Sequence, residues 1–133
     1  MGLSDILFGK PKYVKRTVSY GKTIFRVDVA DSFRKISRGL MGRESVPKYG
    51  GMLFVFGKPG RYGFWMLNMR FSIDIIWLDQ SGRAVHVWKN AETCRSIFSC
   101  RTVAPREYAK YVIEINAGMA SRLGIRKGSR FRI

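Results

Sequence analysis

Acidic residues are scarce in this sequence. Nine Asp and Glu stand against 25 Lys and Arg, so the chain of 133 residues carries a formal net charge of +16. Thermostable proteins also carry many cations, but they usually match them with Glu in ion-pair networks. An unmatched excess of this size repels itself and attracts anions. The shortage of acids therefore favours a polyanionic partner over a surface whose charges serve solubility alone.

Residues for metal binding or nucleophilic catalysis are also few, because the chain offers only Cys94, Cys100 and a single histidine, His86. A structural zinc site needs four such ligands. A catalytic thiol needs a base beside it, and no spacing brings His86 to either cysteine, since it alternates with Ala84 and Trp88 on a predicted strand. We therefore assign no catalytic residue, no metal and no cofactor, and expect a binding protein rather than an enzyme.

Long apolar segments are missing as well. No run of 18 consecutive apolar residues could form a transmembrane helix, and the first residues lack the basic start and the cleavage site of a signal peptide. Gly2 would suit myristoylation, but Ile6 occupies the position where that motif needs Ser or Thr. We therefore expect a cytoplasmic protein that does not insert into a membrane.

The sequence does contain enough apolar material for one core, since 46% of its residues are hydrophobic and 14% are aromatic. We predict an N-terminal extension (1–11) and a single globular domain (12–133). The predicted strands cover residues 12–20, 22–30, 52–56, 63–67, 73–78, 84–89, 111–115 and 129–133. This pattern predicts an α+β fold, either a small β-barrel or a rolled, mostly antiparallel sheet, with two short helices.

The two predicted helices follow different signals. The first has Asp31 or Ser32 as its N-cap and extends to Met41, with Phe33 on its apolar side. The second covers residues 117–123 and ends where glycine stops the helix.

Four blocks stand out along the chain: Arg38-Gly39-Leu40-Met41, Gly51-Met52-Leu53-Phe54-Val55-Phe56, Phe64-Trp65-Met66-Leu67-Asn68 and Ile73-Asp74-Ile75-Ile76. In this order they resemble the domain of unknown function 192 family, a widespread group of small archaeal and bacterial proteins. The later segments 112–118 and 123–128 also fit that family's pattern, so the resemblance spans most of the chain. It implies a small, barrel-like α+β fold and supplies no reaction.

The chain departs from that family's pattern at several polar positions. The family usually has Lys, Thr and Pro where this chain has Leu67, Met69 and Ser72, and Asp where it has Ser129. If the family uses these polar groups to hold a ligand, this protein has lost that use. Its excess of basic residues is then a separate adaptation.

Cys94 and Cys100 are close enough in sequence to form a disulfide around a small loop. Disulfides persist in the cytosol of hyperthermophiles. Two free thiols fit the same spacing, and metal binding is a third alternative.

Asp74 needs an explanation because its neighbours Ile73 and Ile75 are apolar, and a buried carboxylate requires partners. One interpretation is structural, in which backbone groups or Asn68 satisfy the carboxylate. The other is functional, in which Trp65, Asn68 and Asp74 form a pocket for a small molecule or the site of an enzyme. The positive charge of the chain would then steer an anionic ligand to that pocket.

Basic residues concentrate at both ends of the chain, and no acid interrupts residues 10–26 or 122–133. Two glycine-bracketed turns, at 57–60 and 124–128, also present cations together with backbone amides. Arginine binds phosphate through two hydrogen bonds and stacks on exposed bases, which suits folded RNA. The predicted nucleic-acid-binding residues are Lys10, Lys12, Lys15, Arg16, Lys22, Arg26, Lys58, Arg122, Arg126, Lys127, Arg130 and Arg132.

We therefore expect a nucleic-acid-binding accessory protein, most simply one that binds RNA and associates with ribosomal RNA and ribosomal proteins. DNA binding is one alternative, and a small-molecule site at Trp65, Asn68 and Asp74 is another. The RNA hypothesis carries a structural condition. The two basic ends must lie side by side, so that they form one surface.

Overall fold

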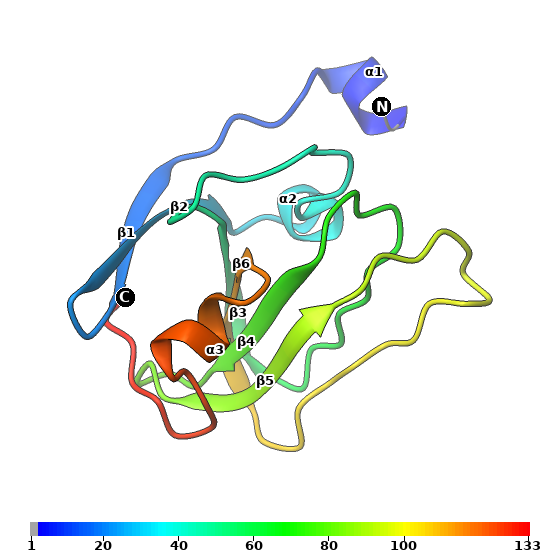
Figure 1. Cartoon of the computed structure of the whole chain (residues 1–133). Coiled ribbons are helices and arrows are strands. Elements are labelled where there is room, and N and C mark those ends of the chain that lie inside the picture. Colours follow the sequence, from blue (N-terminus) through cyan, green and yellow to red (C-terminus); the bar gives the residue numbers. More distant parts are fainter. Residues whose placement is uncertain (1–2) are drawn as a thin grey trace.

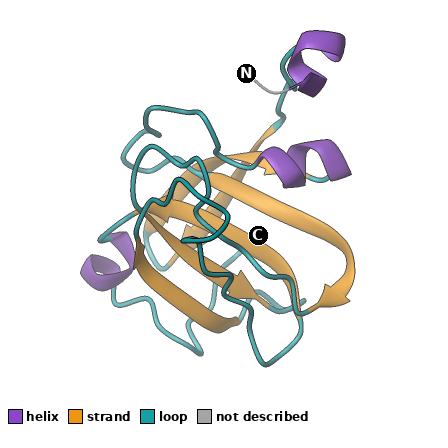
Figure 2. Cartoon of the chain, turned by 90° about the vertical axis from the view of Figure 1, so that its right-hand side faces the viewer, coloured by secondary structure: helices purple, strands orange, loops and turns teal. Residues whose placement is uncertain are grey.

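The computed structural model describes residues 3–133, apart from the side chains of residues 4, 5 and 8. In chain order its elements are α1 (Leu3–Phe8), β1 (Lys15–Tyr20), β2 (Thr23–Ala30), α2 (Phe33–Arg38), β3 (Met52–Gly60), β4 (Ile73–Leu78), β5 (Ala84–Ala91), β6 (Ala109–Asn116) and α3 (Met119–Leu123). The strands form one mixed sheet in the order β1-β2-β3-β6-β4-β5 (Figure 1). The strands curve around the core while the helices lie at the margins (Figure 2). The predicted α+β fold with a barrel-like sheet is confirmed, although the sheet is not closed.

β1 and β2 form the predicted amino-terminal hairpin. Tyr20 pairs with Thr23, so Gly21 and its successor make the turn, and Gly21 has a φ of 57° that glycine adopts without strain. Val18 pairs with Phe25, and both side chains are fully buried. A slip of one residue would turn both side chains to the wrong face, so their burial fixes the register.

β2 and β3 run parallel, whereas the other four strand pairs are antiparallel, as predicted for a mostly antiparallel sheet. Two neighbouring parallel strands need a crossover connection between them, and α2 with the loop that follows it provides this connection. The hydroxyl of Ser32 caps α2 by accepting a hydrogen bond from the backbone N–H of Lys35. Ser32, one of the two predicted N-cap residues, is therefore the N-cap of α2.

α2 is shorter than predicted. It ends at Arg38 rather than Met41, because Gly39 takes a φ of 53° and leaves the helical conformation. Phe33, predicted on the apolar side of the helix, is instead exposed. A helix of six residues turns few side chains to the sheet, and in α2 Ile36 is the one that packs against the core.

β6 is the central strand of the molecule. It pairs antiparallel with β3 on one side and with β4 on the other. Its side chains alternate between the two faces of the sheet, so Val112 joins one apolar cluster while Ile113 and Ile115 join the other. α2 packs on the first cluster through Ile36, and α3 contributes Met119 to the second. Each face of the sheet therefore has its own core and its own helix.

The predicted strand at 63–67 does not join the sheet. It forms isolated bridges, from Phe64 to Val103 and from Leu67 to Cys94, with the loop between β5 and β6. That loop turns back on itself through a disulfide, so it offers no continuous extended partner along which a ladder could grow.

The predicted strand at 129–133 also forms only isolated bridges. Arg132 pairs with Ser19 in β1, while Arg130 pairs with Arg83 just before β5. The segment thus touches both edge strands of the sheet at single points. It spans the gap between the edges without closing it by a regular ladder.

α1 lies within the predicted N-terminal extension, and both cartoon views show it apart from the sheet (Figure 1, Figure 2). In the part of the chain that the structure describes, no helix has the length and apolar composition needed to cross a bilayer.

Candidate functional sites

The two basic ends of the chain meet at one margin of the sheet. Ser19 and Arg132 exchange two backbone hydrogen bonds, of 2.9 and 2.8 Å. Tyr20 follows Ser19 and Phe131 precedes Arg132, and the ring centroids of these two residues lie 5.1 Å apart. The hydroxyl of Tyr20 is 3.4 Å from that of Ser129. The carboxyl terminus accordingly lies beside the β1–β2 hairpin (Figure 1). The two ends therefore lie side by side at this margin, as the RNA hypothesis requires, although only some of their cations meet there.

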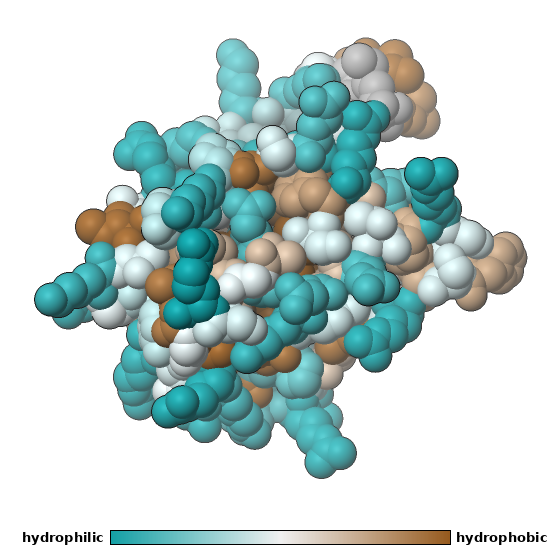
Figure 3. All heavy atoms as spheres, in the orientation of Figure 1, coloured by the Kyte–Doolittle hydropathy of each residue, from teal (hydrophilic) through white to brown (hydrophobic). Residues whose placement is uncertain are grey.

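We define the basic edge as the exposed cations Lys22, Arg26, Arg126, Arg130 and Arg132. Lys22 lies in the hairpin turn, and Arg26 follows on β2. Arg132 pairs with the strand next to β2, and Arg126 and Arg130 precede it on the same segment. None of these five side chains forms an ion pair with an acid within the described residues. Hydrophilic side chains project at this margin of the molecule (Figure 3).

Two acids of the segments that border the basic edge, Asp28 and Glu107, are paired with other cations. Asp28 lies 2.7 Å from Lys15 and 2.7 Å from Arg43. Burial alone would raise the pKa of the Asp28 carboxyl, but the hydrogen bonds from these two cations lower it below its usual value. Glu107 lies 3.0 Å from Lys127, and its pKa is lowered by that hydrogen bond. The predicted contacts Lys15 and Lys127 are therefore neutralised, and the basic edge is not.

A pair of arginines continues the basic edge toward β5. Arg130 lies directly opposite Arg83, an arrangement that places like charges side by side and is unfavourable without an anion. Arg83 turns to Glu107 at 3.3 Å, while Arg130 donates a hydrogen bond of 3.1 Å to the hydroxyl of Ser81. Asp79 accepts a hydrogen bond of 2.7 Å from the same Ser81 hydroxyl. Two carboxylates, Glu107 and Asp79, therefore lie beside three cations, Arg83, Lys127 and Arg130.

The remaining predicted nucleic-acid contacts are exposed but lie away from the junction of the two ends. Lys10 and Lys12 precede β1 at its end far from the hairpin turn, and Arg16 lies on β1. Arg122 lies in α3. Lys58 lies near the end of β3, at the end of the β2–β3 pair that is remote from the hairpin turn. The structure thus brings together a subset of the twelve predicted residues.

Trp65, Asn68 and Asp74, suggested as one pocket, lie in different environments. Asp74 is fully buried, and its two carboxylate oxygens each accept a hydrogen bond of 2.8 Å, from the backbone N–H groups of Asn90 and Ala120. Asn68 is exposed. Because both of its oxygens are occupied, Asp74 ties β4 to the end of β5 and to α3, which is a structural role. Trp65 lines a different pocket.

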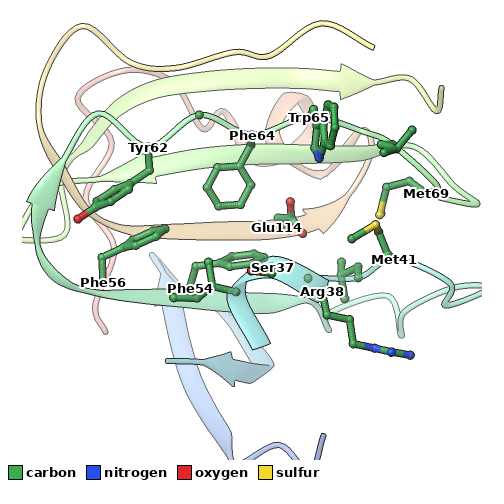
Figure 4. Close-up of a pocket in the computed structure, with 15 residues that line it drawn as sticks. Ser37, Arg38, Met41, Phe54, Phe56, Tyr62, Phe64, Trp65, Met69 and Glu114 are labelled. Atoms are coloured by element: carbon green, nitrogen blue, oxygen red, sulfur yellow. The ribbon is translucent and has the colours of Figure 1, made fainter. Parts of the chain in front are cut away.

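This pocket has a volume of about 290 Å³ and opens between α2, β3 and the loop after β3 (Figure 4). Its wall is mainly apolar and includes five aromatic side chains, Phe54, Phe56, Tyr62, Phe64 and Trp65. Phe56 stacks on Tyr62 at 3.7 Å, and Phe54 meets Phe64 edge to face at 4.8 Å. Trp65 is 41% exposed and pairs with no other ring among the described residues.

Glu114 is the one carboxyl group on the pocket wall. It lies on β6 between Met52 of β3 and Ile75 of β4, neither of which has a side-chain donor. Only 4% of Glu114 is exposed, and nothing in the described part of the chain donates a hydrogen bond to its carboxyl. Burial raises the pKa of Glu114 to about 8. Its carboxyl group points into the pocket, between Phe64 and Met41 (Figure 4).

The sequence prediction missed Glu114. The signal was present, since an acid interrupts the otherwise apolar run Val112-Ile113-Glu114-Ile115. An acid within a buried strand is costly unless it has partners. Only the structure shows that β3 and β4 supply none.

The other polar groups of the pocket lie at its rim. Ser37 and Arg38, both from α2, contribute to the lining. The guanidinium of Arg38 points outward, away from Glu114 (Figure 4). The pocket therefore combines a deep acid of raised pKa, apolar walls with five aromatic rings, and an arginine at its rim whose guanidinium points outward.

The two cysteines and the histidine take structural positions. Cys94 and Cys100 form a disulfide. His86 packs against Trp77 with a distance of 5.3 Å between ring centroids. Across the residues that the structure describes, no three His, Cys, Asp or Glu side chains gather as a metal site would require.

The family model of DUF192, described as an uncharacterized ACR, matches residues 15–133. The chain belongs to the DUF192 family. The resemblance found in the sequence blocks is thereby confirmed.

Curated DUF192 relatives are named UPF0127 proteins, a name that assigns no activity. The protein of Thermococcus gammatolerans is 35% identical over 104 residues, which are 77% of this chain and 62% of that protein. The protein of Thermococcus kodakarensis is 33% identical over 108 residues, which are 77% of this chain and 61% of that protein. The chain therefore spans about three fifths of the length of these relatives.

Two solved structures share the fold. A protein of unknown function from Novosphingobium aromaticivorans is 28% identical with a TM-score of 0.81, and the match covers 90% of this chain and 85% of that one. A candidate transcription regulator from Sinorhizobium meliloti is 29% identical with a TM-score of 0.84, and the match covers 93% of this chain and 97% of that one.

Three of the four blocks that carry the resemblance to DUF192 meet at this pocket. Residues 38–41, 51–56 and 64–68 all contribute to its wall, and the later block 112–118 supplies Glu114. Block 73–76 does not line it. In this chain, segments that are far apart in sequence therefore surround one cavity.

Two departures from the DUF192 pattern fall on the same pocket. Leu67 and Met69, at positions where the family usually has Lys and Thr, both line it. The pocket of this chain is therefore more apolar than the family pattern implies. Arg38 and Glu114 remain as its two residues of charged type.

Proposed function

We propose that this protein binds RNA through the basic edge. The observation that best supports the proposal is the backbone pairing of Ser19 with Arg132, which joins two acid-free segments into one surface. Cations gathered there repel one another. A phosphate backbone would relieve that repulsion, and the release of its counterions would add to the affinity.

The residue types and the secondary structure favour RNA over duplex DNA. Four of the five cations of the basic edge are arginines, whose planar group binds phosphate through two hydrogen bonds and stacks on unpaired bases. α2 and α3 have six and five residues, which is short for a recognition helix in the major groove. We further propose that the RNA is ribosomal, since folded ribosomal RNA offers both phosphates and unstacked bases.

The test compares two double variants that remove the same charge. Arg26→Gln with Arg132→Gln changes the basic edge, whereas Lys58→Gln with Arg95→Gln changes exposed cations elsewhere. Surface ion pairs contribute up to about 1 kcal/mol each, so the first pair should weaken RNA binding roughly tenfold. Fluorescence anisotropy with a structured ribosomal RNA fragment measures this. An equal loss in both double variants, or no binding by the wild type, would contradict the proposal.

Competition identifies the nucleic acid. Ribosomal RNA, single-stranded DNA and duplex DNA are added in turn to the labelled RNA complex. The proposal expects ribosomal RNA to compete best. A preference for duplex DNA would instead favour a role like that suggested by the name of the Sinorhizobium meliloti protein.

A further inference from the structure

The proposed RNA binding at the basic edge does not involve the pocket around Glu114. The pocket is unusual because it contains a buried carboxyl group. A buried carboxyl group without a hydrogen-bond partner destabilises a fold. Glu114, on the central strand between two apolar neighbours, receives no hydrogen bond on its carboxyl from the described chain, and that carboxyl can be reached from the pocket. It differs from Asp74, whose oxygens are both satisfied by the backbone. The carboxyl of Glu114 faces an open cavity, so a ligand can supply the partner that the chain does not.

The shape of the pocket selects a flat ligand. Its walls include five aromatic side chains, and Trp65, which pairs with no other described ring, leaves a face free for stacking. A volume of about 290 Å³ lies at the low end of ligand pockets, which range from roughly 300 to 1,000 Å³. One ring system fits this space better than a larger molecule.

The charge of the protein argues against a cationic ligand. An aromatic cage with a carboxyl group would suit an ammonium ion in a neutral protein, but this chain carries a net charge of +16. Arg38 also lies on the pocket rim, with its guanidinium pointing outward (Figure 4). A neutral ring with an anionic tail matches this distribution of charge.

We propose that the pocket binds a nucleobase, with its ring stacked on Trp65 and its hydrogen-bonding edge on the carboxyl of Glu114. Every nucleobase presents an adjacent donor and acceptor on its Watson–Crick edge. A protonated carboxyl group offers the complementary acceptor and donor, and the base can belong to a free nucleotide or to an RNA chain. This proposal does not rest on RNA binding at the basic edge.

The protonation state of Glu114 fits this pairing. Burial raises its pKa to about 8, so at neutral pH the group carries the O–H donor that the pairing needs. The neighbouring strands present Met52 and Ile75, which do not titrate. Arg38 and Tyr62 are the other ionisable side chains on the pocket wall.

The experiment uses the full chain and isothermal titration with AMP, CMP, GMP and UMP at pH 6.5. Ribose 5-phosphate tests the tail alone, and tetramethylammonium tests the cationic alternative. We expect the nucleotides to bind and these two probes to fail. Binding of ribose 5-phosphate as strong as that of the nucleotides, tighter binding of tetramethylammonium, or no nucleotide binding at millimolar concentration would overturn the proposal.

Two variants separate recognition from packing. Glu114→Met keeps the volume and removes both hydrogen bonds, so it should weaken nucleotide binding roughly tenfold or more. Glu114→Gln keeps one donor and one acceptor, so it should retain binding. Wild-type binding should weaken roughly tenfold from pH 6.5 to pH 9 as the carboxyl ionises, while Glu114→Gln should show no such change. Wild-type affinity in Glu114→Met would refute the role of the carboxyl group.

Testing each variant with the ligand of the other site shows where the base comes from and whether the two sites are independent. Arg26→Gln with Arg132→Gln should leave AMP binding unchanged, because neither residue lines the pocket. If the pocket takes a base from an RNA chain, Glu114→Met also weakens the binding of a short single-stranded RNA. If it takes a free nucleotide, only AMP binding falls. Loss of AMP binding in the basic-edge variant would contradict a separate site.

Discussion

Replacing Glu114 with Gln removes a buried carboxyl group to which the described chain donates no hydrogen bond, and should change how stability depends on pH. In the unfolded chain the carboxyl titrates near its ordinary pKa of 4.5, whereas in the folded chain burial raises the pKa to about 8. Between these values the folded state holds a proton that the unfolded state has released. The contribution of Glu114 to stability is therefore largest below pH 4.5 and is lost as the pH rises toward 8.

The size of this effect follows from the shift in pKa. Each pH unit well inside this range lowers the free energy of unfolding by roughly 1.4 kcal/mol, and less near either pKa. The wild type should therefore lose about 3 kcal/mol between pH 5 and pH 8 from this group alone. The total stability of a domain is about 5 to 15 kcal/mol. Glu114→Gln cannot ionise and should be spared this loss.

Urea denaturation of both proteins at pH 5, 6, 7 and 8 measures the difference. Because all other titratable groups are common to the two proteins, the difference between them isolates Glu114. We expect similar stabilities at pH 5 and a variant more stable by about 3 kcal/mol at pH 8. A difference that stays constant with pH would show that the carboxyl ionises normally in the folded chain, and the account of an unpartnered acid would be wrong.

Two other substitutions test the structural roles assigned to side chains outside the proposed sites. In Asp74→Asn, the amide nitrogen of Asn faces one backbone N–H, of Asn90 or Ala120, and cannot accept its hydrogen bond. Urea unfolding should therefore show a loss of about 2 kcal/mol in the free energy of unfolding, with nucleotide binding intact. Loss of binding without loss of stability would restore Asp74 as a site residue. Replacing both Cys94 and Cys100 with Ala opens a loop with a sequence separation of six and should lower the free energy of unfolding by about 2 kcal/mol. The wild type in reducing agent should match that variant, and identical stability with and without reductant would contradict the disulfide.

Local patterns in the sequence were sufficient for much of the fold. The hairpin follows from alternation and a glycine turn, and Ser32 acts as a cap because its hydroxyl reaches the N–H of a residue three positions later. Phe33 was misplaced because helical spacing alone does not say how many turns a helix will have. Residues 63–67 read as a strand but found no extended partner, and partners are a property of the whole fold.

The candidate sites, too, could be predicted from the sequence only in part. The cations of the basic edge could be named from the sequence, but their meeting depends on the pairing of Ser19 with Arg132, which lie at opposite ends of the chain. The pocket could not be predicted, because it forms where distant blocks converge. Asp74 and Glu114 look alike in sequence, as single acids in apolar strands. Only the tertiary structure shows that the first has two donors and the second has none.

The salt dependence of RNA affinity tests the central claim most directly. Each phosphate contact on single-stranded RNA adds about 0.7 to the slope of log affinity against log salt concentration. If Arg26 and Arg132 bind phosphates, their double substitution with Gln should reduce the steepness of that slope by about 1.4, while Lys58→Gln with Arg95→Gln should leave it unchanged. A slope that is the same in the wild type and in both double variants would contradict RNA binding at the basic edge.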